Sequence, residues 1–269
     1  MKTVFITNDD PVNRSVLSGI ARSYQPSKTL CFFWNSGNEK PRSYLPTPRR
    51  VWGLLNTYAR NMVDARRTKL VNQRLGTTPT SFPSEERIAT RLANAKQTAE
   101  LISSLEPDII VVCGAPILRE RIFGIPKICT INIHFGISSA YRGQHTLFWP
   151  MLENRFDQMG ATIHKIDKGV DTGHLLFEVY PEVSSEDDEA SLELKIAEGI
   201  VAPFVEMLNQ VDNSDQKQLI GQPQQPGGKE IRYRDLGWLK LALFGIKKRL
   251  GMVKTPTISA RNELFYEVR

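Results

Sequence analysis

The sequence contains no long hydrophobic run. No apolar stretch approaches the ~20 residues that a membrane-spanning helix requires. The opening stretch, MKTVFITNDD, lacks the extended hydrophobic region and the cleavage site of a signal peptide. We therefore expect a cytoplasmic protein without a transmembrane segment. With 269 residues, of which 41% are hydrophobic and 24% charged, the chain is long enough to bury a core unaided.

Cysteine and glycine are scarce where two common kinds of site would need them. Cys31, Cys113 and Cys129 are odd in number, have no metal-ligand spacing and lie in apolar, strand-like runs. We interpret them as small buried side chains and expect no metal. The turn TNDDPVN after the first predicted strand contains no glycine. A Gly-rich phosphate site of the dinucleotide or P-loop kind is therefore not expected there.

Positive charge is concentrated in one segment. The whole chain has a net charge of +6, and residues 41–77 contain eight Lys or Arg and one acid, Asp64. A local basic insertion of this kind favours an anionic partner, but a solvated charged helix would show the same pattern. Both interpretations stay open at the level of sequence.

Strand and helix patterns alternate along the chain. Apolar, strand-like runs occupy approximately residues 2–9, 28–35, 108–115, 121–135, 160–167 and 174–183, and helical spacing occurs at 14–24, 51–75, 84–105 and 184–211. Short connections between alternating strands and helices predict an α/β fold with a doubly wound (Rossmann-like), mostly parallel sheet.

The clearest helical pattern is predicted to run from Ser84 to Leu105. Ser84 is a good N-cap, Glu85 and Glu86 suit the first turn, and apolar residues then recur on one face. Pro107 is expected to end this helix.

The last third of the sequence predicts a small, mostly helical extension. Pro203 is expected to kink the helix over 184–211 or break it in two. The tail GWLKLALFGIKKRLG predicts a short apolar helix with a basic end. That helix either docks on the domain or a second subunit, or touches an anionic membrane surface. We divide the chain into a domain over 1–185, with the basic insertion at 41–77, and an extension over 186–269.

Two polar side chains end one of the predicted strands. In the stretch INIHFGISSAYRG, Asn132 and His134 are separated by one residue, so both side chains lie on the same face of the strand. Ligands of doubly wound sheets bind outside the carboxyl ends of the strands. The pair is therefore a candidate site.

The segments NIHFGISSAYRG and GATIHKIDKGVDTGHLLFE together resemble the formyltransferases that use 10-formyltetrahydrofolate. In that family an Asn-x-His ends a strand, an Arg-Gly loop follows, and an Asp-x-Gly turn completes the site. The resemblance implies that Asn132, His134 and Asp171 are catalytic and that residues 1–185 form the catalytic domain. PDIIVVCGAPIL resembles the family's folate-facing loop. The implied cofactor-binding residues are Gly114, Ala115, Pro116, Ile117, Leu118, Arg142, Gly143 and Asp167.

These residue types suit the transfer of a formyl group to an amine. The reaction passes through a tetrahedral intermediate with an oxyanion, to which the Asn132 amide and a His134 N–H would donate hydrogen bonds. The amine must also lose a proton, which either His134 or Asp171 would accept, directly or through water. The sequence leaves open which of the two is the base.

The loop after His134 departs from the family pattern. Gly136, Ile137, Ser138 and Ser139 replace the usual Ser-Leu-Leu-Pro, so the stiffening proline is missing. Phe135 stands where a small residue or proline is common, and it either packs under this loop, which we favour, or stacks on a ligand.

The sequence assigns no catalytic role to the other histidines or to Arg142. We expect His164 to be a strand residue that faces a helix or solvent, and His174 to be positional. His145 either caps the following helix or lines the acceptor pocket. Arg142 either contacts an anionic part of a ligand or braces its loop by pairing with a carboxylate.

The expected acceptor is a primary amine on a small, anionic molecule. Within the resemblance, initiator-tRNA formyltransferases carry a C-terminal β-barrel, and too few residues follow Val211 to form one. Nucleic acid is not expected as a partner, because the basic segment lacks the interleaved aromatics of a stacking platform. GKEIRYRDL resembles a segment of the enzymes that formylate nucleotide-linked amino sugars. We therefore favour such a sugar, with a natural-product amine nearly as well supported.

Two other functions and the oligomeric state stay open. A formyltetrahydrofolate hydrolase would need the same three residues, and a non-catalytic binding protein could use the same fold. A homodimer is compatible with the sequence.

Overall fold

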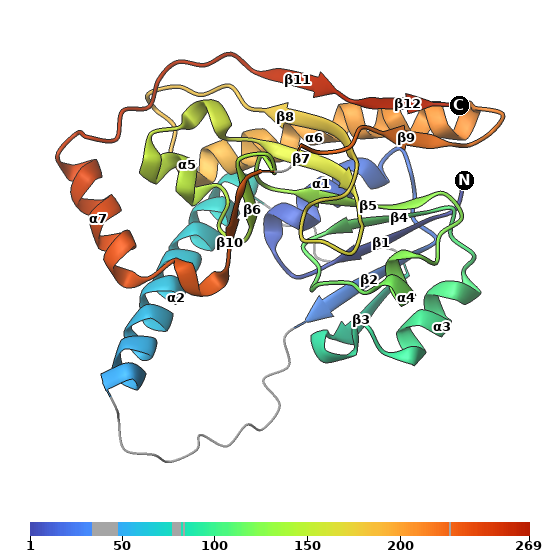
Figure 1. Cartoon of the computed structure of the whole chain (residues 1–269), viewed down its shortest axis with the longest axis horizontal. Coiled ribbons are helices and arrows are strands. Elements are labelled where there is room, and N and C mark those ends of the chain that lie inside the picture. The colour runs from blue at the N-terminus through green and yellow to red at the C-terminus, as the bar shows by residue number, and fades with distance from the viewer. Residues whose placement is uncertain (34–47, 77–81, 83, 226) are drawn as a thin grey trace.

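The computed structural model describes residues 1–33, 48–76, 82, 84–225 and 227–269. Its centre is an eight-stranded sheet with the strand order β11-β8-β7-β5-β4-β1-β2-β3 (Figure 1). The strands are β1 (Thr3–Thr7), β2 (Lys28–Phe33), β3 (Glu85–Ala89), β4 (Ile109–Cys113), β5 (Cys129–His134), β7 (Ala161–Lys165), β8 (Leu175–Tyr180) and β11 (Arg261–Leu264). The run from β5 to β3 is parallel, whereas β7, β8 and β11 pair antiparallel. The predicted mostly parallel, Rossmann-like sheet is confirmed.

Helices cover both faces of this sheet and close two separate cores. Along β1, Phe5 packs with the first core, while its neighbours Val4 and Ile6 pack with the second, as the alternation of strand side chains requires. The first core includes α1 and α6, and the second includes α3 and α4. The α-helices are α1 (Pro11–Ala21), α2 (Pro48–Leu75), α3 (Lys96–Ser104), α4 (Glu120–Phe123), α5 (Phe148–Glu153), α6 (Glu189–Asn213) and α7 (Trp238–Arg249). Short 3-10 helices lie at η1 (Thr90–Leu92), η2 (Phe156–Gln158) and η3 (Tyr233–Asp235).

The C-terminal extension adds strands as well as the predicted tail helix α7. β10 (Lys229–Ile231) pairs with β6 (Tyr141–Gly143), and β12 (Tyr266–Val268) pairs with β9 (Leu219–Gly221). β11 joins the edge of the central sheet (Figure 1). The domain division near residue 185 stays a prediction. None of the helices in the described part of the chain is both long and apolar enough to cross a membrane.

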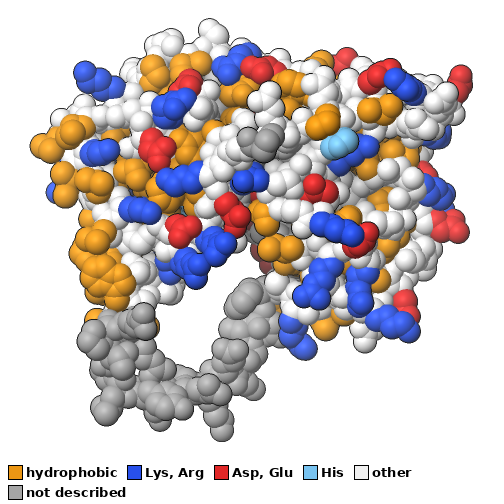
Figure 2. All heavy atoms as spheres, viewed as in Figure 1, with side chains coloured by type: hydrophobic (Ala, Val, Ile, Leu, Met, Phe, Trp, Pro, Cys, Tyr) orange, Lys and Arg blue, Asp and Glu red, His pale blue; other side chains and the backbone are white. Residues whose placement is uncertain are grey.

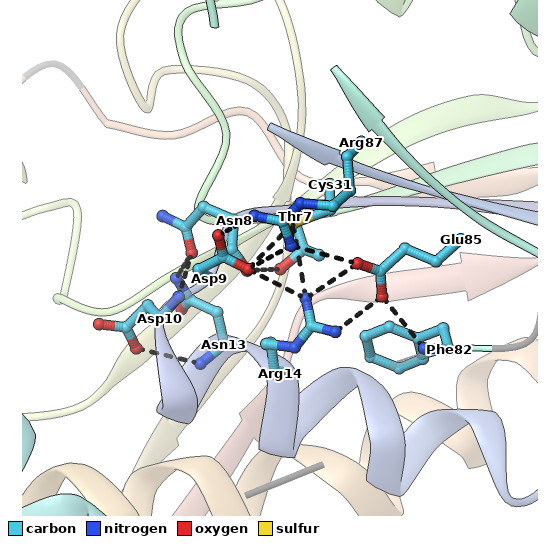
Figure 3. Close-up of polar contacts among 10 residues, drawn as sticks. All are labelled: Thr7, Asn8, Asp9, Asp10, Asn13, Arg14, Cys31, Phe82, Glu85 and Arg87. Atoms are coloured by element: carbon cyan, nitrogen blue, oxygen red, sulfur yellow. Dashed lines mark hydrogen bonds and ion pairs between the residues drawn. The ribbon is translucent and has the colours of Figure 1, made fainter. Parts of the chain in front are cut away.

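The helix predicted over 84–105 is wrong in its first half. Residues 85–89 form β3, η1 follows, and the helix α3 begins only at Lys96. The parallel pairing of β3 with β2 overrides the local helical pattern. Figure 3 shows what holds this edge: the Arg14 guanidinium, only 3% exposed, donates to Glu85 at 2.7 Å, and Glu85 also accepts the Phe82 N–H at 3.1 Å. A buried arginine requires such a partner.

The helix predicted over 184–211 is present as α6, and Pro203 does not break it in two. Asp188 and Ser191 form a capping box at its start. Ile196, Ile200 and Phe204 are fully buried in the first core on both sides of the proline. Tertiary packing of this apolar face offsets the hydrogen bond that proline cannot make.

Part of the basic segment is neutralised inside the protein. Residues 41–47 lie outside the described residues, and most of the remainder forms α2. Arg67 binds Asp10 at 2.7 Å and also Glu193, Arg74 binds Asp188 at 2.8 Å, and Arg60 donates to the Leu236 carbonyl at 3.0 Å. These three arginines therefore attach α2 to α1, α6 and the C-terminal extension.

Candidate active site

The structure brings Asn132, His134 and Asp171 together at the carboxyl end of β5. Asn132 and His134 lie on one face of that strand, and Asp171 lies in the loop between β7 and β8. Asp171 Oδ2 is 3.6 Å from His134 Nδ1, and Asp171 Oδ1 accepts a hydrogen bond of 3.4 Å from Asn132 Nδ2. An amide, an imidazole and a carboxylate thus surround one point at the edge of the sheet.

Asp171 adopts an uncommon backbone conformation that its neighbours stabilise. Its φ is 52°, in the left-handed region, and such residues persist where the surroundings hold them. The Gly143 N–H donates to Asp171 Oδ2 at 2.8 Å. Asp167 braces the same loop, because its Oδ1 accepts from the Gly169 N–H at 2.9 Å and the Thr172 hydroxyl at 2.8 Å. The carboxylate is therefore fixed in position.

A fourth residue, His164, belongs to the cluster. It lies on a strand, as predicted, but the expectation that it faces a helix or solvent was wrong. His164 is 2% exposed, and its Nε2 lies 3.2 Å from Asn132 Nδ2 and 3.5 Å from Asp171 Oδ1. Its Nδ1 lies 2.7 Å from the carbonyl of Lys165. A carbonyl only accepts, so Nδ1 carries the proton, and in the neutral ring Nε2 accepts from the Asn132 amide. His164 therefore orients Asn132.

The pairing of β5 with β7 is the feature that would have indicated that His164 belongs to the site. In the antiparallel pairing of β5 with β7, Asn132 stands opposite His164. Directly opposed residues have neighbouring side chains, but the sequence pattern predicted parallel strands and gave no register for this pair.

Asp171 and His134 have different charge states at neutral pH, because the cluster shifts the pKa of each. Burial raises the pKa of Asp171, but His134, His164 and the Gly143 N–H outweigh burial and bring that pKa down to about 2. Burial lowers the pKa of His134 from its ordinary value of 6.5, against the opposing effect of Asp171. At neutral pH the arrangement is therefore an ionised carboxylate beside a neutral imidazole.

A cavity of about 790 Å³ opens beside this cluster. One wall contains the predicted residues Gly114, Ala115, Pro116, Ile117 and Leu118 from the loop after β4, together with the 166–171 loop that includes Asp167. Gly114 has a φ of 76°, and a Cβ there would lie 2.0 Å from the side-chain nitrogen of Asn13. Glycine is therefore needed where this wall approaches α1.

Arg142 is not brought to this cavity, although Gly143 is. The Arg142 guanidinium donates to the carbonyl of Gly228 at 3.3 Å, so it contacts the C-terminal extension rather than a carboxylate. Gly143 has a φ of 95°, and a Cβ there would lie 2.1 Å from the carbonyl oxygen of Ile231. This loop therefore passes tightly against β10.

Another part of the cavity lining, here called the acidic wall, is rich in carboxylates, which the sequence analysis did not predict. It contains Asp10 at the N-terminus of α1, Asp64 and Arg67 from α2, and Glu189 and Glu193 from the first turns of α6. Burial and the neighbouring Glu193 raise the pKa of Glu189 to about 7. Arg67 is the basic residue of this wall and is already paired with Asp10 and Glu193.

The loop that lacks the family's proline is held by other contacts. Ile137 is 3% exposed, and the Ser138 N–H donates to the Thr162 hydroxyl at 3.0 Å. The Ser138 hydroxyl and Gln224 Oε1 are 2.6 Å apart, and the Gln224 amide donates to the Gly173 carbonyl at 2.6 Å. Gln224 of the extension thus connects this loop to the Asp-Thr-Gly turn.

The structure also places the remaining residues that the sequence analysis discussed: Phe135, His145, His174 and the three cysteines. Phe135 packs against the first core, as expected, and also lines the cavity. His145 lines the cavity on its acidic side, and burial lowers its pKa. His174 is exposed. All three cysteines are free, with Cys31 and Cys113 buried and Cys129 half-buried.

Among the described residues, no group of three or more His, Cys, Asp or Glu side chains is placed to hold a metal ion.

Comparison with known proteins identifies the family. Residues 64–208 match the formyl transferase family, which is more than half of the chain, and the chain belongs to that family. Methionyl-tRNA formyltransferase of Caldicellulosiruptor saccharolyticus is 31% identical over 124 residues, or 46% of this chain and 40% of that protein. The methionyl-tRNA formyltransferase of a Sulfurihydrogenibium species is 32% identical over 126 residues, again 46% and 40%. The chain thus spans about two-fifths of the length of these curated relatives.

Solved structures share the fold over nearly the whole chain. A sugar N-formyltransferase from a Shewanella species superimposes with a TM-score of 0.55 at 14% identity, covering 100% of this chain and 99% of the other. A 4-N formyltransferase from Francisella tularensis gives a TM-score of 0.55 at 14% identity, with 97% and 98% covered. At this identity the likeness concerns the fold alone.

Proposed function

We propose that the chain transfers a formyl group from 10-formyltetrahydrofolate to the primary amine of a small acceptor such as an amino sugar. The observation that carries this proposal is the meeting of Asn132, His134 and Asp171 beside one cavity. Asn132 and Asp171 are 39 residues apart in sequence, and the fold brings both Asn132 and His134 against Asp171.

The wall formed by residues 114–118 fits the folate co-substrate. The volume of about 790 Å³ lies within the usual range for ligand pockets. Ile117 is 78% exposed at this wall and offers apolar surface to a flat ring. The loop over 166–171 also lines the cavity. The formyl group is then expected to lie next to Asn132 and His134.

Asn132 is proposed to donate a hydrogen bond to the formyl oxygen as that oxygen becomes negative. One amide hydrogen is directed to His164, and the second makes a long contact of 3.4 Å with Asp171. The long contact leaves the second hydrogen available to a ligand oxygen. A preorganised donor of this kind stabilises the transition state by about 2.7–4 kcal/mol.

His134 is proposed to accept the proton of the attacking amine. With its pKa near 2, Asp171 is a weak base at neutral pH. The neutral His134 ring lies between two acceptors, since Asp171 Oδ2 is 3.6 Å from Nδ1 and the Tyr141 carbonyl is 3.4 Å from Nε2. A protonated ring would be stabilised by both. Asp171 therefore orients the ring and stabilises its charged form.

The acidic wall is proposed to bind the amine-bearing part of the acceptor. Asp64, Glu189 and Glu193 would attract an ammonium group and accept hydrogen bonds from hydroxyls. Phosphates of an anionic carrier would be repelled there and would stay near Arg232 on the cavity lining. This distribution favours a small amino sugar over an acceptor whose phosphates must enter the cavity.

A panel of amines tests the proposal. Each amine is incubated with 10-formyltetrahydrofolate and the protein, and mass spectrometry detects the gain of one formyl group. We expect Asn132→Ala and His134→Ala each to lower kcat/KM by about 100-fold or more. Asn262→Ala, on an exposed strand at the sheet edge, is the matched control and should keep the wild-type rate. Formate release that is unaffected by any amine would instead indicate a hydrolase.

A further inference from the structure

Two helices present apolar stripes to solvent. On α7 and its C-cap the stripe consists of Leu239, Leu243, Ile246 and Leu250, and on α2 it consists of Val51, Leu55, Tyr58 and Met62. Both sets have the spacing i, i+4, i+7, i+11, which places each set on one helical face. These side chains are between 45% and 68% exposed. Figure 2 shows hydrophobic side chains gathered over α7 and the adjoining part of α2, at the left of the view.

The stripes are additional to the faces that pack on the protein. Phe244 of α7 contacts Phe148 with ring centroids 5.1 Å apart. Leu241, on the same side of α7, packs against the small core around Trp149. On α2, Val71 is fully buried in the first core. Each helix is therefore anchored by one apolar face while a second remains uncovered.

Helices α2 and α7 contact each other near the start of α7. Trp52 and Trp238 pack edge to face with ring centroids 5.3 Å apart. The backbone N–H of Trp238 donates to the side-chain oxygen of Asn56 at 2.9 Å, and Arg60 donates to the Leu236 carbonyl at 3.0 Å. These contacts hold the two helices together, and the eight stripe residues that they expose are here called the α2–α7 face.

The two segments that carry the stripes contain basic residues and no acidic ones. No acidic residue occurs between Asp235 and Glu263, or from residue 48 to 63. Lys248 and Arg249 at the end of α7 are exposed, and so is Lys254 after it. An apolar stripe flanked by exposed Lys and Arg is typical of helices that lie in a membrane interface.

We propose that the α2–α7 face docks on the surface of an anionic lipid bilayer. The apolar stripes would enter the boundary between headgroups and acyl chains, and the basic side chains would lie among lipid phosphates. A second copy of this chain fits less well. A two-fold contact through this face would bring Lys248 and Arg249 of one chain against the same basic surface of its partner.

Docking through this face would hold the proposed active site close to the bilayer. Val63 and Asp64 of α2 line the cavity and follow Met62 of the stripe directly. The helix would lie on the bilayer surface without crossing it, in keeping with the finding on the described helices.

Sedimentation with vesicles tests the proposal. The full chain is mixed with vesicles of phosphatidylglycerol and phosphatidylcholine, or of phosphatidylcholine alone. We expect binding to the anionic vesicles that is lost at high salt. Ile246→Glu should weaken binding by about ten-fold or more, because one stripe residue then carries a charge. Leu264→Glu is the matched control, with a wild-type residue of similar exposure (60% against 56%) on β11 and the same change in charge. It should bind like wild type.

The other outcomes overturn the proposal. Equal sedimentation with neutral and anionic vesicles would remove the anionic lipid as the occupant. Equal weakening by Ile246→Glu and Leu264→Glu would show that net charge, not the stripe, controls binding. A dimer in sedimentation velocity that Ile246→Glu dissociates, without vesicle binding by the wild type, would assign the face to a second copy. Matching far-UV circular dichroism and thermal midpoints establish that both variants fold.

Discussion

Replacing Arg67 with alanine should destabilise the fold by about 3–5 kcal/mol, the usual cost of leaving a buried carboxylate without its partner. Arg67 donates from Nε to Glu193 at 2.6 Å, makes a second contact with the same carboxylate, and binds Asp10 at 2.7 Å. Glu193 is 7% exposed. Asp10 contributes less to the loss, because its side chain is 23% exposed and also accepts the Val12 N–H at the N-cap of α1.

The loss of folding stability in Arg67→Ala should increase with pH. Burial raises the pKa of Glu193 even though Arg67 opposes it, and removing Arg67 raises the pKa further. A carboxyl whose folded-state pKa lies above its unfolded value destabilises the fold when it is ionised. The deficit of Arg67→Ala should therefore be largest at high pH. It should shrink as the pH falls through the raised pKa toward the unfolded value of 4.5.

Urea unfolding of wild type, Arg67→Ala and the double variant Arg67→Ala/Glu193→Gln at pH 5 and pH 8 measures this effect. A change in midpoint at constant slope reports stability. The double variant should recover part of the loss, because its neutral amide replaces the unpaired charge. A loss below about 1 kcal/mol at pH 8, or a loss that grows toward pH 5, would refute the reasoning.

Three further predictions concern the cavity. His164→Phe removes the acceptor for the Asn132 amide and should lower kcat about ten-fold with little change in KM, in steady-state kinetics; an unchanged kcat would contradict this role. Since burial lowers the pKa of His134, the midpoint of the acid limb of kcat should lie below pH 6.5; a midpoint above 6.5 would exclude His134 as the base. Because the pKa of Glu189 is about 7, Glu189→Gln should raise KM for the acceptor more at pH 8 than at pH 6; equal effects would argue against an ionic contact.

The sequence predicted the parallel core well because its strands carry their own signal. The run over 109–113 is fully buried on both faces, and such strands read as continuous apolar stretches. The pattern over 85–89 is different, since strand β3 lies at the edge of the sheet and only Ile88 and Ala89 are buried. Its charged residues favoured a helix start locally, and only pairing with β2 makes them a strand.

The site was predictable where residues are close in sequence and not where the fold brings them together. Asn132 and His134 share a strand, so their common orientation follows from alternation alone. The acidic wall combines Asp10, Asp64 and Glu193 from three different helices. Their meeting depends on how α1, α2 and α6 pack. Long-range packing of this kind has no local pattern in the sequence.

The two edges of the central sheet have a consequence for how the chain associates in solution. β3 and β11 are the outermost strands, and their sequences EERIA and RNEL carry charged side chains. An incoming strand from another molecule would have to bring its own groups against these charges, which discourages edge-to-edge growth into aggregates. Any assembly of this protein is therefore expected to use helical surfaces. The edge strands β3 and β11 are not expected to pair with strands of another copy.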